Sequence, residues 1–404
     1  MGAARPLTGL PASARFVVVG AGVHGLSTAY HLAEAGAEVV VLEKTRVGAG
    51  ASGVSGGIVR SFYRSPALHE LVRRSVEIFE VDPSLFGFRH VGYIAVVPEA
   101  QAEELELIAG AQAEIGYASR VVRGEERVRE HMRALFPDWR ARGSAALLHE
   151  QRSGWADAET TVRALAGMAR SQGARVYEGV TVTAFDGARV ESDAGVVECE
   201  AVVLAPGPWA RDLLPELEFH YWQVREGEYS HARGALDPRD PVVHVDADVA
   251  VADLPVPWGI YFRPGLRGGV ACGGLPVALE PDCELDPYGP SHPELGKTTR
   301  EFDRSIEEAL TWTLNRFEPA DAWSASSFGA ATCFTADSYP VVGFVRDGVY
   351  AIVDSNHGFK LLALGQLAAR ELLGGDAPEL DAFRADRFGR AELHPVSASP
   401  YPWT

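Results

Sequence analysis

The stretch RFVVVGAGVHGLSTAYHLAEAGAEVVVLEK, residues Arg15–Lys44, decides the fold. Its first apolar run predicts a strand over Phe16–Gly20, and the small and apolar residues that follow predict a helix over Gly25–Ala35. A second apolar run predicts a buried strand over Glu38–Leu42. Strand, helix and strand in this order form the unit from which parallel α/β sheets are built. We therefore expect an α/β fold that begins near residue 14.

A glycine fingerprint lies between the first strand and the helix. Gly20, Gly22 and Gly25 have the spacing G-x-G-x-x-G. The first permits a tight turn, the second lets the backbone approach a pyrophosphate, and the third lets helix and strand pack closely. Glu43 closes the second strand, where its carboxylate can accept hydrogen bonds from an unphosphorylated ribose. The pattern predicts a dinucleotide site that takes FAD or NAD rather than NADP.

Two features favour FAD over NAD. The segment Gly48–Gly57, which follows the second strand, is rich in small residues and long enough to wrap a flavin pyrophosphate. The chain also returns to strand-and-turn patterns at Ala201–Trp209 and at Ala351–Lys360, and the second return places another helix start near the cofactor. An NAD-dependent dehydrogenase with the same fingerprint is the alternative, and the absence of flavin absorbance from the purified protein would support it.

The remaining sequence suggests an interrupted domain. Segments with parallel, doubly buried character alternate with stretches that are mostly antiparallel strands, so we expect a Rossmann-like FAD-binding domain and an interleaved α+β substrate domain. The expected FAD-binding domain comprises residues 14–65, 150–215 and 330–375, the substrate domain residues 66–149 and 216–329, and the C-terminal tail residues 376–404.

Composition excludes several classes of partner. The chain has 404 residues and a formal net charge of -18, which argues against binding to nucleic acid or to anionic membranes. Its four cysteines form no Cys-x-x-Cys pair, so we expect neither a metal site nor a disulfide framework, and a reducing cytoplasm fits. The N-terminus does not resemble a secretory signal, and no apolar run is long enough to span a bilayer. We expect a cytoplasmic monomer or small homo-oligomer.

Three motifs give the sequence a family resemblance. They are GAGVHGLSTAYHLAEAG at 20–36, GASGVSGGIVRSFY at 50–63, and TADSYPVVG at 335–343 followed by SNHGFK at 355–360. With them the chain resembles the D-amino-acid oxidase superfamily of FAD-dependent oxidoreductases over residues 14–375, nearest its sarcosine- and dimethylglycine-oxidising branch. The resemblance implies a GR2-type FAD-binding domain and a small amine or amino acid as substrate. It also implies oxidation of a C–N bond to an imine, which water hydrolyses, with oxygen or another acceptor taking the electrons.

The resemblance and the fingerprint together give a set of residues expected to line FAD. The adenine would lie near backbone groups of Val180. The whole set is Gly20, Gly22, His24, Gly25, Glu43, Lys44, Gly50, Ser52, Ser55, Gly56, Gly57, Val180, Ala205, Gly207, Trp209, Asn356, Gly358, Phe359 and Lys360.

Arg60 and Lys360 are the foremost candidates for substrate chemistry. Arg60 follows the glycine-rich segment and aligns with a carboxylate-binding arginine of sarcosine oxidases, and its planar fork suits a carboxylate. Lys360, one of three lysines in the chain, stands where relatives carry a lysine near flavin and carboxylate. For each, the alternative is an ordinary surface cation.

A second group of candidates surrounds these two. His357 lies beside Gly358 and can hydrogen-bond flavin or substrate, while Tyr261 and Arg263 stand on a strand of the insert that would floor the substrate pocket. A structural role is the alternative for each of them, as it is for Arg225 and Tyr63, which belong to the same group.

Two departures from the family pattern bear on the reaction. Monomeric sarcosine oxidases hold FAD through a cysteine thioether, but Cys333 is displaced from that position by about three residues, so we expect non-covalent FAD. Those oxidases also carry a lysine over the flavin on a strand that matches Gly268–Gly274, where this chain has GGVACGG. The missing lysine raises a dehydrogenase with another electron acceptor as an alternative to an oxidase. A non-catalytic FAD-binding assembly factor is the third possibility, against which the presence of both Arg60 and Lys360 argues.

Overall fold

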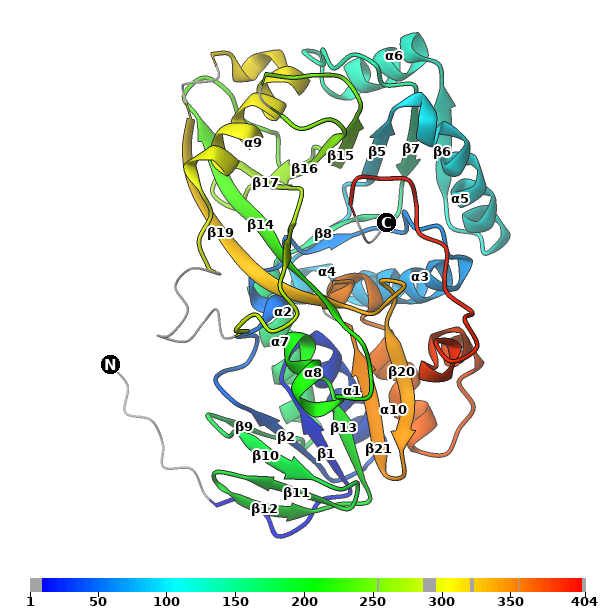
Figure 1. Ribbon diagram of the computed structural model, residues 1–404, viewed down its shortest axis with the longest axis vertical. Helices are drawn as coiled ribbons and strands as arrows, with labels where there is room; N and C mark the ends of the chain where they lie inside the picture. The colour runs from blue at the N-terminus through cyan, green and yellow to red at the C-terminus, as the bar shows by residue number, and fades with distance from the viewer. Residues whose placement is uncertain (1–8, 253, 286–295, 320–322, 355, 402–404) are drawn as a thin grey trace. The chain divides into compact units, whose positions relative to one another are not determined.

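The computed structural model describes residues 9–252, 254–285, 296–319, 323–354 and 356–401. The chain divides into two compact units (Figure 1). Unit 1 comprises Met1–Val54, Ala158–Phe219 and Cys333–Leu393, and unit 2 comprises Ser55–Asp157, His220–Thr332 and His394–Thr404. An α/β unit interleaved with a unit built on a large mixed sheet confirms the expected fold class.

A six-stranded sheet organises unit 1. Its strand order is β20-β21-β13-β1-β2-β9, and all neighbours are parallel except the antiparallel pair β20 and β21. The strands are β1 (Phe16–Val19), β2 (Val39–Glu43), β9 (Arg175–Glu178), β13 (Ala201–Leu204), β20 (Val341–Arg346) and β21 (Val349–Val353). The central strands β1 and β13 are buried throughout, as continuous valine-rich runs in parallel sheets are.

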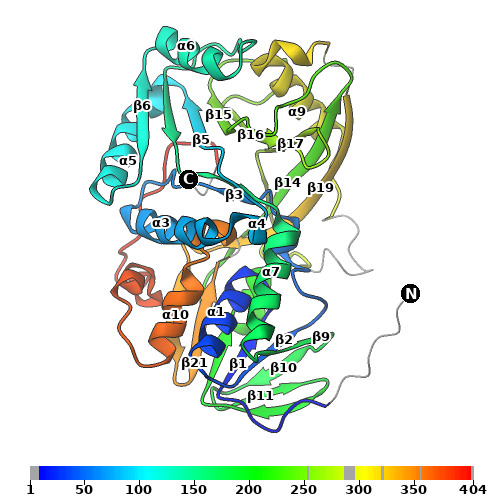
Figure 2. The same cartoon turned by 180° about the vertical axis from the view of Figure 1, so that it is seen from behind.

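Three helices of unit 1 lie side by side against this sheet (Figure 2). They are α1 (Val23–Glu34), α7 (Ala158–Ser171) and α10 (Leu364–Leu372), with α1 in the middle. Small residues allow the close packing of α1 and α10, because a Cβ added at Gly365 would lie 2.3 Å from the Ser27 hydroxyl oxygen. The shorter elements are α2 (Ala51–Val54), α8 (Ala210–Leu213), η2 (Gly207–Trp209), η4 (Gly358–Leu361), η5 (Pro378–Phe383), η6 (Ala385–Arg387) and the antiparallel strands β10 (Val182–Phe185), β11 (Arg189–Ser192) and β12 (Gly195–Glu198).

Unit 2 contains a large mixed sheet. Its order is β18-β14-β17-β16-β15-β5-β7-β6, with β19 paired to β14. The strands are β5 (Tyr93–Val97), β6 (Ser119–Arg123), β7 (Ala146–Glu150), β14 (His220–His231), β15 (Val242–Ala247), β16 (Trp258–Pro264), β17 (Val270–Gly274), β18 (Val277–Leu279) and β19 (Trp323–Phe334). Along the order from β18 to β6, neighbouring strands are antiparallel except β5 and β15, which are parallel.

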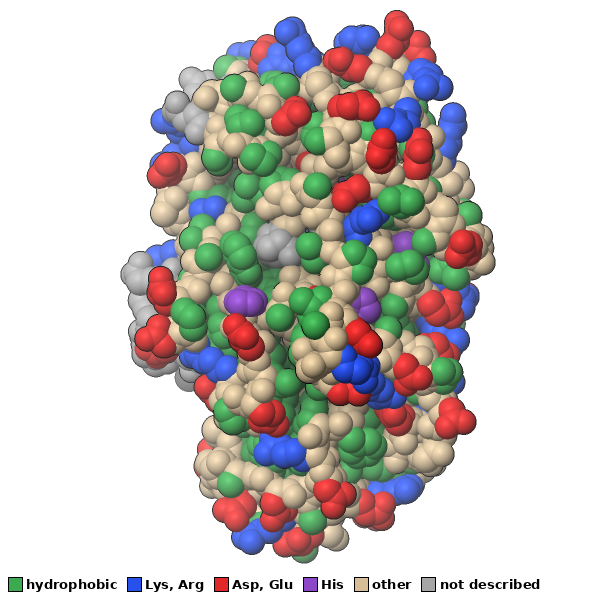
Figure 3. All heavy atoms as spheres, turned by 45° about the vertical axis from the view of Figure 1, so that its right-hand side comes forward, with side chains coloured by type: hydrophobic (Ala, Val, Ile, Leu, Met, Phe, Trp, Pro, Cys, Tyr) green, Lys and Arg blue, Asp and Glu red, His purple; other side chains and the backbone are tan. Residues whose placement is uncertain are grey.

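Helices and short segments complete unit 2. Helix α9 (Arg300–Thr313) packs its apolar face, including Phe302 and Leu310, into one core cluster with strands β16 and β17. The others are α3 (Pro66–Val81), α4 (Pro83–Phe86), α5 (Ala102–Glu114), α6 (Glu125–Leu135), η1 (Glu99–Gln101), η3 (Asn315–Phe317) and the small sheet of β3 (Ile58–Val59), β8 (Gly154–Ala156) and β4 (Phe88–Arg89). Acidic and basic side chains are interspersed over the face seen in Figure 3.

The two compact units do not follow the expected domain bounds everywhere. Unit 2 takes in residues 55–65 and 150–157, because β3 pairs with β8 through the register of Ile58 with Trp155. Residues 376–393, expected to be part of a separate tail, belong to unit 1. There the Arg387 guanidinium makes a bidentate, buried ion pair with Asp337, at 2.8 and 2.9 Å.

Candidate FAD and substrate sites

The glycine turn of unit 1 has no room for side chains. A Cβ at Gly20, whose φ is +105°, would lie 2.3 Å from the Ala205 carbonyl oxygen, and one at Gly25 would lie 2.1 Å from the Gly20 carbonyl oxygen. A Cβ at Gly22 would lie 3.0 Å from the Ser52 hydroxyl oxygen. The turn thus leaves backbone N–H groups at the start of α1 uncovered by side chains of its own, as an anion-binding turn requires.

Ser52 contacts the start of α1 from the small-residue segment Gly48–Gly57, which we call the wrap. Its hydroxyl accepts a hydrogen bond from the Val23 N–H at 3.1 Å, while the N-cap residue Gly22 has no side chain to cap the helix. The first N–H groups of a helix lack partners within the helix and carry a partial positive charge. Ser52 and the first turn of α1 therefore form a polar end suited to a phosphate.

Glu43 stands at the end of β2 beside the turn. Its carboxylate accepts hydrogen bonds from the Ala21 N–H at 2.9 Å and from the Thr45 N–H and hydroxyl at 3.0 and 3.1 Å. These bonds fix the carboxylate, whose oxygens have about four acceptor sites in total, at the place where the fingerprint puts ribose recognition. The N–H of Val180 donates to the Glu43 carbonyl at 2.9 Å, so the expected approach of an adenine is left to the Val180 carbonyl.

Residues of the wrap and of the turn that follows β13 come together around Trp209. The Lys44 ammonium lies 3.8 Å from the centre of the Trp209 ring, and a Cβ at Gly50 would lie 3.4 Å from the same ring. Gly207, with φ of +57°, begins the turn that presents Trp209, and its carbonyl accepts from the Cys333 thiol at 3.4 Å. Lys44 is therefore engaged with an aromatic face in a cation–π contact.

A buried carboxylate joins two histidines of unit 1, His24 and His357. Asp354 lies 2.9 Å from Nε2 of His24 and 2.8 Å from Nδ1 of His357, and it also accepts the backbone N–H groups of His357 and Gly358, each at 3.1 Å. Burial alone would raise the pKa of Asp354, but the charge of His357 and the hydrogen bonds from both imidazoles outweigh it. They hold the pKa of Asp354 well below its ordinary value.

Sequence reasoning named both histidines but missed Asp354. The available signal was its position directly after the buried strand β21, at the edge of the sheet where the carboxyl ends of parallel strands meet. Phe359 and Lys360 lie further along the same turn. Phe359 is buried, and the Lys360 ammonium donates to the Asn356 carbonyl at 3.5 Å. Lys360 thus folds back along its own turn in the short helix η4 rather than extending from the first turn of α10.

The second half of the wrap lies in unit 2. The Gly57 N–H donates to the Ser55 hydroxyl at 3.1 Å, and the Gly57 carbonyl accepts from the Ala156 N–H at 2.8 Å. A Cβ at Gly56 would lie 2.9 Å from a carboxylate oxygen of Glu226. The predicted wrap therefore continues as a backbone strip packed against β8 and β14.

Arg60 is buried in unit 2 among aromatic rings. Its guanidinium carbon lies 4.6 Å from the centre of the Tyr63 ring and 5.7 Å from that of Tyr93, and Nη1 donates to the Phe62 carbonyl. Burial alone would lower the pKa of Arg60, but the phenols and the carboxylates of Glu150 and Asp246 raise it. Arg60 is thus a fixed cation, with two buried carboxylates nearby, rather than a surface arginine.

Glu150 is a further residue that the sequence did not single out. Its carboxylate accepts from the Ser61 N–H at 2.8 Å, the Ser153 hydroxyl at 2.6 Å and the Gln112 amide at 2.8 Å. Burial raises the pKa of Glu150, and these hydrogen bonds and the charge of Arg60 only partly offset that effect. The network anchors the backbone next to Arg60.

Tyr261 and Arg263 occupy the expected strand β16, each held by a defined partner. The Tyr261 hydroxyl donates to Glu226 at 2.6 Å, and burial together with the Glu226 charge raises the pKa of Tyr261 well above its ordinary value. Arg263 donates through Nε to the Gly56 carbonyl at 2.9 Å and lies 4.1 Å from the Trp155 ring centre. Arg263 therefore supports the wrap, and Tyr261 faces Glu226.

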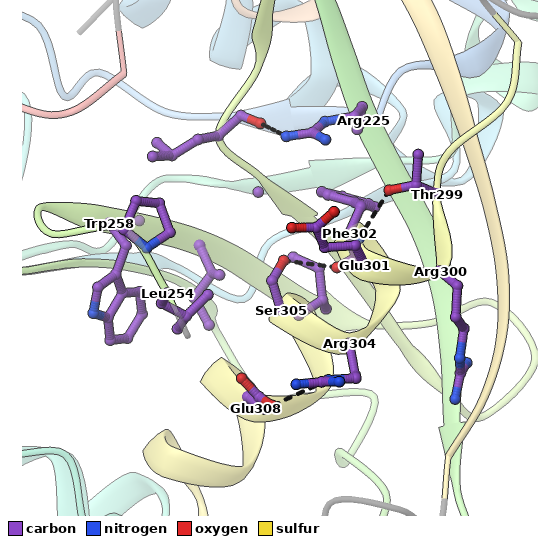
Figure 4. Close-up of a pocket in the computed structure, with 16 residues that line it drawn as sticks. Arg225, Leu254, Trp258, Thr299, Arg300, Glu301, Phe302, Arg304, Ser305 and Glu308 are labelled. Carbon is purple, nitrogen blue, oxygen red and sulfur yellow. Dashed lines mark hydrogen bonds and ion pairs between the residues drawn. The ribbon is translucent and has the colours of Figure 1, made fainter. Parts of the chain in front are cut away.

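Arg225 does not join this group. It precedes Glu226 on β14, and successive strand residues point to opposite faces of a sheet. Its guanidinium instead lies 4.4 Å from the Phe302 ring centre, in a cavity beside α9 (Figure 4).

In the described part of the chain no helix is both long and apolar enough to cross a membrane.

These features together define a class of protein. A parallel sheet with a glycine turn, a carboxylate at the end of the second strand and a serine over the helix start is the architecture of a dinucleotide-binding protein. Residues 15–371 match the family described as FAD dependent oxidoreductase, and the chain belongs to this family. The enzyme is thus an FAD-dependent oxidoreductase, and its relatives include amine and amino-acid oxidases and dehydrogenases.

Three comparisons illustrate the relationship. The chain is 29% identical over 306 residues to 4-methylaminobutanoate oxidase (formaldehyde-forming) of Paenarthrobacter nicotinovorans, covering 70% of this chain and 35% of that protein. It is 26% identical over 248 residues to monomeric sarcosine oxidase of Streptomyces avermitilis, covering 57% of this chain and 62% of that protein. The crystal structure of L-proline dehydrogenase from P. horikoshii has the same fold, with a TM-score of 0.81, 21% identity, and coverage of 95% of this chain and 100% of that one. The chain thus spans about a third of the length of 4-methylaminobutanoate oxidase and somewhat under two thirds of the length of monomeric sarcosine oxidase.

Proposed function

We propose that the chain oxidises the C–N bond of a secondary or N-methylated amino acid to an imine, which water then hydrolyses. The support is of two kinds. Two of the relatives, 4-methylaminobutanoate oxidase and monomeric sarcosine oxidase, act by their names on N-methylated amino acids, and residues 15–371 match the FAD-dependent family. FAD, when bound, supplies the acceptor for a hydride equivalent from the carbon next to the amine.

Arg60 is the observation that carries this proposal. A carboxylated amine needs a cation that fixes its orientation, and a guanidinium offers two parallel N–H groups to a carboxylate. Arg60 is fixed by the Tyr63 and Tyr93 rings and by its bond to the Phe62 carbonyl, so binding orders no flexible side chain. We assign it to the substrate carboxylate.

The other candidates have supporting roles in this proposal. Lys360 supplies a positive charge that stabilises the reduced flavin, and His357 is held by Asp354 in one orientation for a hydrogen bond. Tyr261, whose hydroxyl is engaged by Glu226, lines the substrate pocket, and Arg263 keeps the Gly56 carbonyl in place. Each role orients or holds a group rather than forming a covalent bond.

FAD binding is proposed to be non-covalent. The chemistry of unit 1 fits the cofactor, because the crowded glycines, Ser52 and Glu43 provide a backbone cradle, a phosphate end and a ribose acceptor. Cys333 is buried and its thiol points to the Gly207 carbonyl, which supports a structural thiol rather than a flavin thioether. Acid precipitation of the purified protein tests this: the yellow colour should pass to the supernatant, whereas flavin retained in the pellet would contradict the proposal.

An anaerobic substrate screen tests the reaction. Sarcosine, dimethylglycine, 4-methylaminobutanoate, proline and glycine are mixed with the holoenzyme without oxygen, and bleaching of the flavin absorbance is followed. We expect carboxylated secondary or N-methylated amines to bleach the flavin faster than primary or uncharged amines. A flavin that stays oxidised with the whole panel would instead favour a non-catalytic FAD-binding assembly factor.

A dehydrogenase is the second candidate, favoured by one feature of β17. The segment Gly268–Gly274 contains no lysine, and a Cβ at Gly273 would lie 2.2 Å from the Tyr261 hydroxyl, so the strand has no space for a larger residue there. Peroxide release under air with a substrate from the screen would identify an oxidase. Reduction of an artificial dye without peroxide would identify a dehydrogenase that passes electrons to another acceptor.

A further inference from the structure

Unit 2 contains a cavity on the opposite face of its sheet from Glu226 and Tyr261. The cavity has a volume of about 600 Å³ and is bounded by β14, β16, the end of β17 and the first half of α9 (Figure 4). Ligand sites generally fall between about 300 and 1,000 Å³. Because Arg225 and Glu226 are consecutive on β14, the cavity is separated by the sheet from the side chains assigned to amine oxidation.

Arg225 is a cation without an ion pair in this cavity. Nη2 donates to the Leu275 carbonyl at 2.8 Å and the guanidinium stacks on Phe302, but no described carboxylate lies within ion-pair distance of it. Its Nε is buried and has no hydrogen-bond partner among the described residues. Burial lowers the pKa of Arg225, and electrostatic interactions with Tyr229, Glu301 and Tyr401 only partly offset that effect. A partly buried cation in this state favours an anionic partner.

The cavity lining is partly polar, with the hydroxyls of Thr299 and Ser305 and the carboxylates of Glu301 and Glu308, and partly apolar. Trp258 and Leu254 lie across from Phe302, and Ile260 and Ile306 continue this surface. The rim carries further cations, but these already have partners on their own helix: Arg300 pairs with Glu307 at 3.3 Å and Arg304 with Glu308 at 3.4 Å. Arg225 is therefore the group that an anion entering the cavity would reach between aromatic and aliphatic walls.

We propose that this cavity is a second small-molecule site, distinct from the amine-oxidising site, which binds an organic carboxylate with a flat or branched apolar body. The carboxylate accepts hydrogen bonds from the Arg225 guanidinium, and the apolar body lies between Trp258 and Phe302. Charge and shape thus select the ligand together, since a guanidinium recognises carboxylates by its fork and the aromatic walls favour apolar groups. The site does not depend on the amine chemistry proposed above.

Binding of 3-phenylpropionate to the FAD-loaded protein, measured by titration calorimetry, tests this proposal. This probe has the required carboxylate and ring but no amine to oxidise. We expect 3-phenylpropionate to bind without changing the visible flavin spectrum and its neutral amide to bind at least about tenfold more weakly. No binding at millimolar concentration, equal binding of the amide, or binding that perturbs the flavin and persists when Arg225 is replaced would overturn the proposal.

Variants locate the probe. Arg225→Gln should weaken binding at least about tenfold, whereas Arg300→Gln, which removes a rim arginine already paired with Glu307, should leave it unchanged. Ser305→Phe provides a test that keeps Arg225, since the larger ring fills part of the cavity, and it should abolish binding. Unaltered affinity in Ser305→Phe, with a folded protein by circular dichroism, would show that the probe binds elsewhere. Because flavin bleaching by amines is measured separately, failure of this site leaves the proposed reaction untouched.

Discussion

The carboxylate of Asp354 lies 2.9 Å from Nε2 of His24, and this contact links the first turn of α1 to the turn that follows β21. The two residues are 330 positions apart in the chain. Asp354 also holds His357 and the Gly358 N–H, so a single buried carboxylate fixes two of the turns expected to contact FAD. A carboxylate held by four or more donors is a rigid element, and its loss leaves several polar groups unsatisfied.

Asp354→Asn should therefore destabilise unit 1 and weaken FAD binding. Replacing one partner in a buried charged network costs about 3–5 kcal/mol. We expect a lower melting temperature of the apoprotein and a higher Kd for FAD, measured by quenching of flavin fluorescence on reconstitution. Asp386→Asn, which removes an exposed carboxylate paired with Arg390, is the matched control and should change neither quantity. An Asp354→Asn variant with wild-type stability and FAD affinity would contradict this role.

The same carboxylate predicts a pH dependence. Its pKa in the folded chain is well below its ordinary value, so the unfolded chain binds the proton more tightly. The stability that ionised Asp354 provides is present in full above the unfolded pKa of about 3.9 and is lost as the pH falls through the lower folded pKa. Chemical denaturation of wild type and Asp354→Asn across acidic pH should show the difference between them shrinking as the pH falls below about 4. A difference independent of pH in this range would argue that the carboxylate charge is not what stabilises the turn.

Arg60→Met should impair turnover of carboxylated amines selectively. Loss of a buried charged contact corresponds to about 2–4 kcal/mol in kcat/KM, expressed mainly as a higher KM. Arg64→Met is the control, because Arg64 is partly exposed and pairs with Glu104 at 3.7 Å. The measurement is steady-state kinetics with the best substrate of the anaerobic screen, after a check of folding, since Glu150 and Asp246 lose a nearby cation. Equal losses for the two variants, or none for Arg60→Met, would remove Arg60 from the substrate site.

Gly25→Ala should prevent formation of the cofactor turn. The added methyl group would lie 2.1 Å from the Gly20 carbonyl oxygen, a separation that backbone atoms relieve only by moving. We expect purified Gly25→Ala to lack flavin absorbance, and to be less stable than wild type by thermal denaturation. Gly167→Ala is the matched control: this glycine lies inside α7 with nothing within 4 Å of an added Cβ, so alanine should raise helix stability by about 0.5–1 kcal/mol. Normal flavin content in Gly25→Ala would contradict the crowding argument.

Arg387→Met should show that residues 376–393 belong to unit 1. Arg387 and Asp337 are both buried, and their bidentate pair joins η6 to the TADSYP segment. Removing one partner leaves a buried charge, which costs about 3–5 kcal/mol. Arg390→Met, at an exposed pair with Asp386, should cost less than about 1 kcal/mol. Denaturant unfolding followed by circular dichroism compares the two, and equal stability would mean that the C-terminal segment is dispensable.

The sequence predicts secondary structure correctly where residues close together in the chain determine it. The strand, glycine turn and helix over residues 16–34 follow from apolar runs and from glycines that a turn demands. Elsewhere, tertiary pairing overrode the local reading. Residues 196–204 are divided between β12 and β13, because each half pairs within a different sheet. Helix α6 was missed because its sequence is mostly charged and buries only Val128 and Met132.

By itself, the sequence determined the α/β class and the dinucleotide turn, because backbone sterics and apolar periodicity act between residues close in the chain. It also singled out Arg60 and Lys360 as candidates for the substrate site. Only the tertiary structure decided which groups these residues meet. Asp354 and His24 come from opposite ends of the chain, and the buried carboxylates Glu150 and Asp246 gather near Arg60 from different strands. Burial of charge is a property of the folded surroundings rather than of any local stretch. The partners that fix each site therefore appear only once the strands are assembled.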